Sequence, residues 1–157
     1  MHLGVQGGKE GILTLLNLDN LSGQGGPGHI GGEVQDISGP GGSILTAPVV
    51  WVDGTGRTWA FVATGSALAG YDVTLNGSNV PQLTQRWSVS TGATSPILAN
   101  GVLYAAGSGS IRAYNPTTGG APLWSAPIGS THWQSPVVVD GLVLMEDLAG
   151  HLTAWGL

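Results

Sequence analysis

A repeat of about forty residues runs through this chain and restricts the folds that it can form. Its marker is a turn residue followed by alternating apolar positions, which is typical of a half-buried strand. The marker occurs at residues 11–17 (GILTLLN), 66–72 (SALAGYD), 109–115 (GSIRAYN) and 150–155 (GHLTAW). Its third position falls at residues 13, 68, 111 and 152, which gives intervals of 55, 43 and 41 residues. The spacing predicts a repeat architecture with loop additions.

Two other strand-like segments precede the marker in a fixed order. A Ser/Ala-Pro pair with apolar residues begins each unit, and a second apolar run follows it. No window sustains a helical period, and four short strands in forty residues are typical of a propeller blade. We therefore predict an all-β propeller of four-stranded antiparallel blades. The first segments are residues 47–50, 95–98 and 135–138, the second are 58–62, 102–106 and 142–145, and outer strands end at Trp87 and Trp124.

Glycine supplies 28 of the 157 residues, and hairpin turns explain most of it. Gly101 and Gly141 each follow an Asn or Asp, so they are predicted to provide the positive φ of a two-residue hairpin turn. Gly109 and Gly150 are expected to do the same in the next hairpin. Turns between strands therefore account for the glycine content without a ligand.

Residues 107–124 (GSGSIRAYNPTTGGAPLW) first suggest a phosphate-binding glycine loop. A G-x-G-x-x-G loop needs a third glycine where this chain has Arg112, and it needs a helix that opens from the loop. We expect instead a hairpin turn at 107–110, a third strand, and a turn at 115–120 into an outer strand that ends at Trp124.

Counting strands in this register predicts a single partial domain over residues 1–157. Its blades are an incomplete one at 1–42 without an innermost strand, two whole ones at 43–91 and 92–130, and an incomplete one at 131–157. Long inserts are expected at 19–42 and 73–82. About three and a half blades leave strand edges and apolar faces uncovered, so we expect a protein partner, the missing half of the propeller, or self-association.

The units resemble the pyrroloquinoline-quinone-type propeller repeat. Residues 135–155 carry the resemblance, residues 5–13 form another copy, and residues 113–124 are similar to the family's tryptophan-docking motif. Trp87 closes a second, altered copy, and the N-terminal copy has Gly23 but no Trp. The resemblance implies a ring of about eight blades and a periplasmic or secreted location, although we expect no signal peptide in this chain. The family includes quinoprotein dehydrogenases and a bacterial outer-membrane assembly lipoprotein.

Composition excludes several functions. Four cationic residues against nine acidic ones cannot build the basic surface that nucleic acid requires. The absence of cysteine removes disulfides, thiolate nucleophiles and zinc–thiolate sites, together with the adjacent cysteines of many quinoprotein dehydrogenases. No apolar run reaches the length of a membrane span. No family motif for calcium, quinone or catalytic base can be matched, so we assign no catalytic, cofactor or metal residue and expect no cofactor.

Several polar groups resemble sites and are interpreted as turns. Glu146 and Asp147, with His151 four residues on, suggest a metal or acid–base site, but a solvated hairpin turn is the favoured interpretation. Residues 53–56 (DGTG) resemble part of a calcium loop but lack the spaced acids of an EF-hand.

The histidines and tryptophans offer weaker candidates. The four histidines, at positions 2, 29, 132 and 151, have no short metal-binding spacing. His132 and Trp133 are expected near the mouth of the central channel, with a structural role favoured over a ligand role. Trp87 and Trp124 are predicted to pack between neighbouring blades.

Three functions follow from these patterns. The leading one is a non-catalytic propeller segment that acts as a scaffold or protein-interaction surface in an exported bacterial-type protein. The alternative is the C-terminal part of a pyrroloquinoline-quinone-dependent dehydrogenase whose catalytic residues lie outside this chain, so the question of enzyme activity stays open. A carbohydrate-binding propeller that uses exposed Trp51 or Trp59 is the third.

Overall fold

The computed structural model describes residues 1–22 and 31–156, and this part of the chain is almost entirely β-structure. One short 3₁₀ helix, Leu18–Asn20, follows the second strand. The fourteen strands are β1 (Leu3–Gly7), β2 (Ile12–Asn17), β3 (Glu33–Ser38), β4 (Val49–Val52), β5 (Thr58–Ala63), β6 (Leu68–Leu75), β7 (Pro81–Val89), β8 (Ile97–Ala99), β9 (Val102–Gly107), β10 (Ser110–Asn115), β11 (Gly119–Pro127), β12 (Val137–Val139), β13 (Leu142–Glu146) and β14 (Leu152–Gly156).

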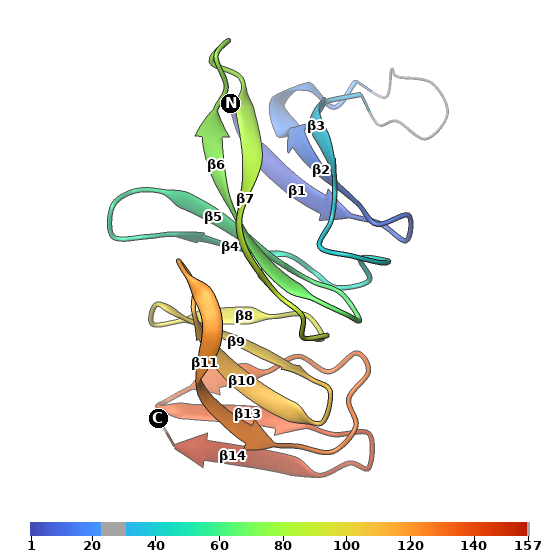
Figure 1. The fold of residues 1–157 in the computed structure, drawn as a ribbon, viewed down its shortest axis with the longest axis vertical. Coiled ribbons are helices and arrows are strands. Elements are labelled where there is room, and N and C mark those ends of the chain that lie inside the picture. Colours follow the sequence, from blue (N-terminus) through green and yellow to red (C-terminus); the bar gives the residue numbers. More distant parts are fainter. Residues whose placement is uncertain (23–30, 157) are drawn as a thin grey trace.

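The strands form four antiparallel sheets that follow one another along the chain (Figure 1). The first sheet is β1-β2-β3, the second β4-β5-β6-β7, the third β8-β9-β10-β11 and the fourth β12-β13-β14. Each sheet is a meander in which sequential strands pair. The third residue of the repeat marker pairs with the equivalent residue of the preceding strand in all four sheets. The prediction of an all-β fold built from four-stranded antiparallel units, with about three and a half of them present, is confirmed.

The core lies between consecutive sheets because alternate residues of each strand point to opposite faces. Leu13 and Leu15 of the first sheet pack with Ala60 and Val62 of the second. The opposite face of β5 packs on the third sheet, and the third sheet packs on the fourth in the same way. Each inner sheet is thus covered on both faces, while each end sheet has a neighbour on one face.

The predicted hairpin turns are confirmed at the backbone. Gly101 and Gly141 both have φ of 74°, and the preceding Asn100 and Asp140 also have positive φ, at 51° and 49°. Two successive residues with positive φ are what a type I′ hairpin turn requires. Gly109 is likewise in the left-handed region, at 76°, between β9 and β10.

Strand boundaries differ from the prediction at both ends of the repeat unit. The innermost strands begin after the proline of the Ser/Ala-Pro pair, at Val49, Ile97 and Val137, because proline has no N–H to donate to a sheet. The outer strand β11 begins at Gly119 and does not end at Trp124, since it continues to Pro127. The predicted turn at 115–120 is therefore shorter than expected.

The two predicted inserts consist partly of strand residues. The segment 19–42 contains β3, the outer strand of the first sheet, and residues 23–30, with Gly23 and His29, lie outside the described residues. The segment 73–82 mostly lengthens a hairpin, because β6 runs to Leu75 and β7 starts at Pro81. In that hairpin the hydroxyls of Thr74 and Thr84 lie 3.0 Å apart across the pair.

Candidate functional site

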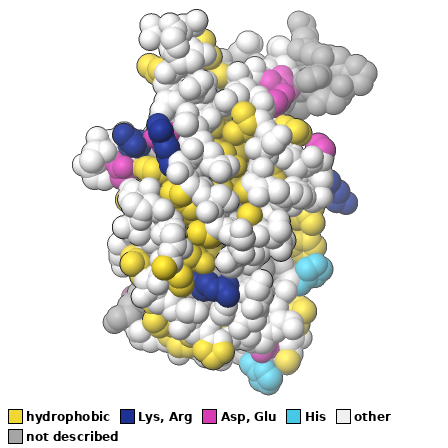
Figure 2. Space-filling view, in the orientation of Figure 1, with side chains coloured by type: hydrophobic (Ala, Val, Ile, Leu, Met, Phe, Trp, Pro, Cys, Tyr) yellow, Lys and Arg dark blue, Asp and Glu magenta, His cyan; other side chains and the backbone are white. Residues whose placement is uncertain are grey.

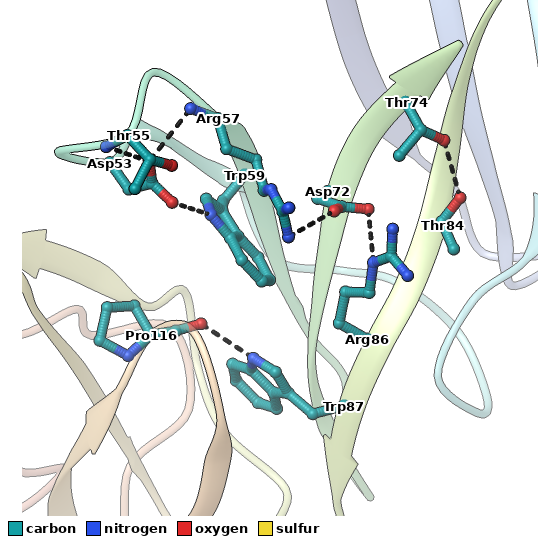
Figure 3. Close-up of polar contacts among 10 residues, drawn as sticks. All are labelled: Asp53, Thr55, Arg57, Trp59, Asp72, Thr74, Thr84, Arg86, Trp87 and Pro116. Carbon is teal, nitrogen blue, oxygen red and sulfur yellow. Dashed lines mark hydrogen bonds and ion pairs between the residues drawn. The ribbon is translucent and has the colours of Figure 1, made fainter.

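A buried carboxylate organises a polar cluster on the second sheet, on the side of the third (Figure 3). Asp72, on β6, has no exposed side-chain surface. Arg86 Nε, from β7, donates to Asp72 Oδ1 at 2.8 Å, and Arg57 Nη1, from the turn just before β5, lies 3.3 Å from Asp72 Oδ2. A buried carboxylate is tolerated when cations pair with it. The two arginines, each about half exposed, therefore neutralise Asp72 and also present guanidinium surface to solvent.

The turn between β4 and β5 forms the second half of this cluster. Asp53 Oδ1 accepts hydrogen bonds from Thr55 N, Thr55 Oγ1 and Arg57 N, at 2.8, 2.6 and 3.0 Å. Asp53 Oδ2 accepts one from Trp59 Nε1 at 2.9 Å. These bonds, those from the Thr55 hydroxyl and the Trp59 indole first, hold the pKa of Asp53 well below its usual range. The interpretation of residues 53–56 as a hairpin turn is confirmed, with Asp53 as its cap.

Trp87 joins the second sheet to the third. Its side chain is 8% exposed, and its Nε1 donates to the carbonyl oxygen of Pro116, in the turn between β10 and β11, at 2.8 Å. A Cβ added to Gly119 would lie 2.5 Å from the indole, so only glycine fits beside this ring. Trp124 is half-buried at the equivalent place, where its ring meets Trp155 of the fourth sheet edge-on at 5.7 Å. The predicted packing of Trp87 and Trp124 between sheets agrees with these contacts, while their membership of a family motif stays a prediction.

Gln35 takes the place of this tryptophan in the first sheet, and the sequence analysis missed it. Register makes the positions equivalent, because Gln35 pairs with Leu15 as Trp87 pairs with Gly70. Gln35 Oε1 accepts from Leu83 N of the second sheet at 2.6 Å, and its Nε2 donates to Leu83 O at 3.4 Å. The signal is its place in a repeat copy that lacks Trp, in a segment whose sequence indicates only a turn-rich insert.

A shallow polar cleft of about 440 Å³ lies beside the cluster. Its lining combines the turn of the second sheet with Thr117 of the third, together with both arginines. Two carboxylates and two guanidiniums balance in formal charge here. The cleft therefore offers hydrogen-bond donors without a strong net charge, which suits a polar contact more than proton transfer.

The outward face of the fourth sheet is apolar and uncovered. We call this the open face: Val137, Val139, Leu142 and Leu152, which are between 40% and 68% exposed. Register places Leu152 at the position of Leu68 in the second sheet, which is fully buried against the third. The open face thus carries side chains of the kind that are buried between the other sheets.

Charged groups are sparse on the face of the molecule shown in Figure 2, where apolar side chains lie among polar ones.

Asp147 caps a hairpin and is not solvated, which corrects the interpretation of this segment. It is 7% exposed, while Glu146 is exposed. Asp147 Oδ1 accepts from Ala149 N and His151 N at 2.9 and 3.0 Å, and His151 Nδ1 lies 3.1 Å from Oδ2. The backbone N–H of His151, with help from its ring and from Ala149 N, lowers the pKa of Asp147. The carboxylate of Asp147 therefore accepts hydrogen bonds from its own turn in place of water.

Of the aromatic candidates, Trp59 is placed differently from the prediction. Trp59 is 3% exposed because its side chain faces the third sheet, so it cannot serve a carbohydrate surface, and Trp51 is partly buried. His132 and Trp133 lie before β12 with ring centroids 4.2 Å apart, and Trp133 is 61% exposed. His2 Nδ1 lies 2.6 Å from Asp19 Oδ1 at the surface.

Within residues 1–22 and 31–156, no three His, Asp or Glu side chains gather closely enough to hold a metal ion. The same residues include no helix that is long and apolar enough to cross a membrane.

Comparison with known proteins gives structural relatives but no family. No protein-family model and no curated protein matches the chain. The computationally designed Ika4 protein is similar, with a TM-score of 0.64 and 16% identity over 99% of this chain and 86% of that one. The designed Ika8 protein gives 0.63 and 15% over 100% and 43%, and BBS1N, solved in complex with ARL6DN, gives 0.60 and 15% over 98% and 47%. The chain thus spans less than half of Ika8 or BBS1N. These similar structures are β-propellers, and at these identities the similarity shows the fold alone. This chain therefore forms a partial β-propeller.

Proposed function

We propose that this chain is a non-catalytic β-propeller segment that works as a scaffold and protein-interaction surface. The observation that carries the proposal is the open face. Its valines and leucines lie at positions that the second and third sheets bury against a neighbour. Covering them removes apolar surface from water, which is the main driving force of protein association.

A protein is the partner that fits this face. The surface belongs to a three-stranded sheet, and its side chains lie on both β12 and β13 at the spacing that the other sheets use to pack on one another. BBS1N, a propeller of similar fold, was solved in complex with ARL6DN, so a propeller of this kind does bind a protein. From the resemblance of its repeat, we also propose that the chain belongs to an exported bacterial-type protein.

Sedimentation equilibrium of the purified chain over a hundred-fold concentration range tests the proposal, with the chain itself as the available protein partner. We expect the wild-type chain to self-associate and the double variant Leu142→Lys/Leu152→Lys to be monomeric, because two ammonium groups on the open face cannot be buried without partners. The matched control is Leu75→Lys/Leu123→Lys, which changes two leucines outside the open face that are 63% and 64% exposed.

The control variant should associate as the wild type does, and circular dichroism should be the same for all three proteins. A wild-type chain that stays monomeric throughout, or a control that dissociates as fully as the open-face variant, would contradict the proposal.

A further inference from the structure

Among residues 1–22 and 31–156, the first sheet has no innermost strand of the kind that β4, β8 and β12 form in the other three sheets. In the second and third sheets β5 and β9 pair on one side with an innermost strand, and β13 does so in the fourth. The strand β1 occupies the corresponding place in the first sheet and is an edge strand among the described residues. A backbone edge of this kind can pair with an extended peptide.

The neighbouring strand shows what is missing. Val50, on β4, faces the first sheet and is 55% exposed. Its equivalents in the third and fourth sheets, Leu98 and Val138, are partly buried in clusters that also contain residues of the preceding innermost strand. Val52, two residues on and on the same face, is 58% exposed. The exposed valines therefore lie where the other sheets have an apolar strand.

An apolar cleft of about 510 Å³ adjoins the same edge. Its lining includes Leu3, Gly4 and Val5 of β1 on one side, and Val50 and Ala60 of the second sheet on the other. Apolar lining of this kind, with a backbone edge alongside, provides both the burial and the hydrogen bonds that strand addition uses.

We infer that β1 binds an extended segment of a partner polypeptide as a fourth, innermost strand of the first sheet. The occupant is defined by the strands that fill this place elsewhere in the chain: a Ser or Ala, a proline, and then apolar residues at alternate positions, as in residues 47–52, 95–99 and 135–139. This inference rests on the proposed function and names the chemistry of a partner for it.

The register of the added strand follows from the repeat. Val5 is equivalent to Phe61 and Tyr104, which pair with the residue directly after the proline. The residue after the partner's proline should therefore lie opposite Val5, and the residue two further on opposite Leu3. Both would face Val50 and the cleft, whereas the residue between them would lie on the other face, opposite Gly4.

A peptide with the sequence of residues 93–100 (ATSPILAN), labelled with fluorescein, is the probe for the full chain. Fluorescence anisotropy should show saturable binding, and Val50→Glu should weaken it by about ten-fold or more because the peptide would bury an unpaired carboxylate. Leu123→Glu adds the same charge at an exposed site on the third sheet and should change the affinity by less than about two-fold.

Peptide variants test the register independently of any change in the protein. Replacement of the residue after the proline by Asp should weaken binding about ten-fold, and the same replacement one residue later should have a much smaller effect. Amide hydrogen exchange should slow in β1 when the peptide binds.

Three results would overturn the inference: no binding at about 1 mM peptide, equal binding by a scrambled peptide, or equal binding by Val50→Glu. The open face is on the fourth sheet and the peptide probes the first. A wild-type chain that self-associates but does not bind the peptide would therefore refute this inference alone. Loss of self-association with intact peptide binding would refute only the role of the open face.

Discussion

Trp87 links the second sheet to the third by burial and by a hydrogen bond, so its removal should destabilise the fold strongly. An indole of this kind buries about 150–250 Å², and at about 25 cal/mol per Å² its burial is worth about 4–6 kcal/mol as an upper bound. The side chain is 8% exposed and also donates to Pro116 O at 2.8 Å. We expect Trp87→Ala to lower the free energy of unfolding by about 3–5 kcal/mol, the range for buried Trp→Ala changes.

Urea unfolding followed by circular dichroism measures this loss, and Tm should fall by roughly 10 °C in a domain of this size. Trp87→Phe separates the two contributions, since it keeps a ring between the sheets and leaves Pro116 O without its donor, at a cost of about 1–3 kcal/mol. Trp124→Ala is the matched comparison: its ring is only half-buried, so it should cost about 2 kcal/mol. A loss under about 1 kcal/mol for Trp87→Ala, or a larger loss for Trp124→Ala, would refute the reasoning.

Three further predictions follow from the polar contacts. Arg86→Met should lower the free energy of unfolding by about 2 kcal/mol or more, and by more than Arg57→Met, because Arg86 lies closer to the buried carboxylate of Asp72 than Arg57 does. Chemical denaturation of both variants, with Arg112→Met as a control, tests this. Gln35→Ala should cost about 1–3 kcal/mol by leaving Leu83 N and O unpaired between sheets, and a neutral result in the same assay would mean that water replaces the amide there. The folded-state pKa values of Asp53 and Asp147 are lowered, so their charged forms stabilise the fold above about pH 4, and this stability is lost as pH falls from there through the folded pKa values. The urea midpoint should therefore fall as the pH is lowered from about 5 to about 2, and it should fall less steeply in Asp147→Asn than in the wild type. A pH dependence that is the same in both proteins would show that this carboxylate is not linked to folding.

The sequence predicted what depends on local pattern. Turn residues such as Gly101 and Gly141 lie where the backbone needs positive φ, and alternation around Leu68 and Ile111 identifies strands whose inward residues are fully buried. A repeat strengthens both signals because each copy is an independent observation of the same unit. The fold class was therefore accessible without a structure.

The polar cluster was not accessible in the same way. Arg57 precedes β5, whereas Asp72 and Arg86 lie on β6 and β7, and the three show no short spacing, so only the pairing of these strands brings them together. Trp59 was expected at the surface as a candidate sugar contact, but it belongs to the face of β5 that packs on the third sheet. Such errors arise because alternation tells which residues share a face and does not tell which face has a neighbour.

Amide hydrogen exchange, compared between dilute and concentrated samples, tests the central claim most directly: that the fourth sheet carries an unfilled interface. Self-association through the open face should slow exchange in β12, β13 and β14 at high concentration, while β5 and β9, already covered on both faces, should not change. In the variant Leu142→Lys/Leu152→Lys the concentration dependence should disappear. Exchange in the fourth sheet that is the same at both concentrations, or that slows equally in the lysine variant, would contradict the claim.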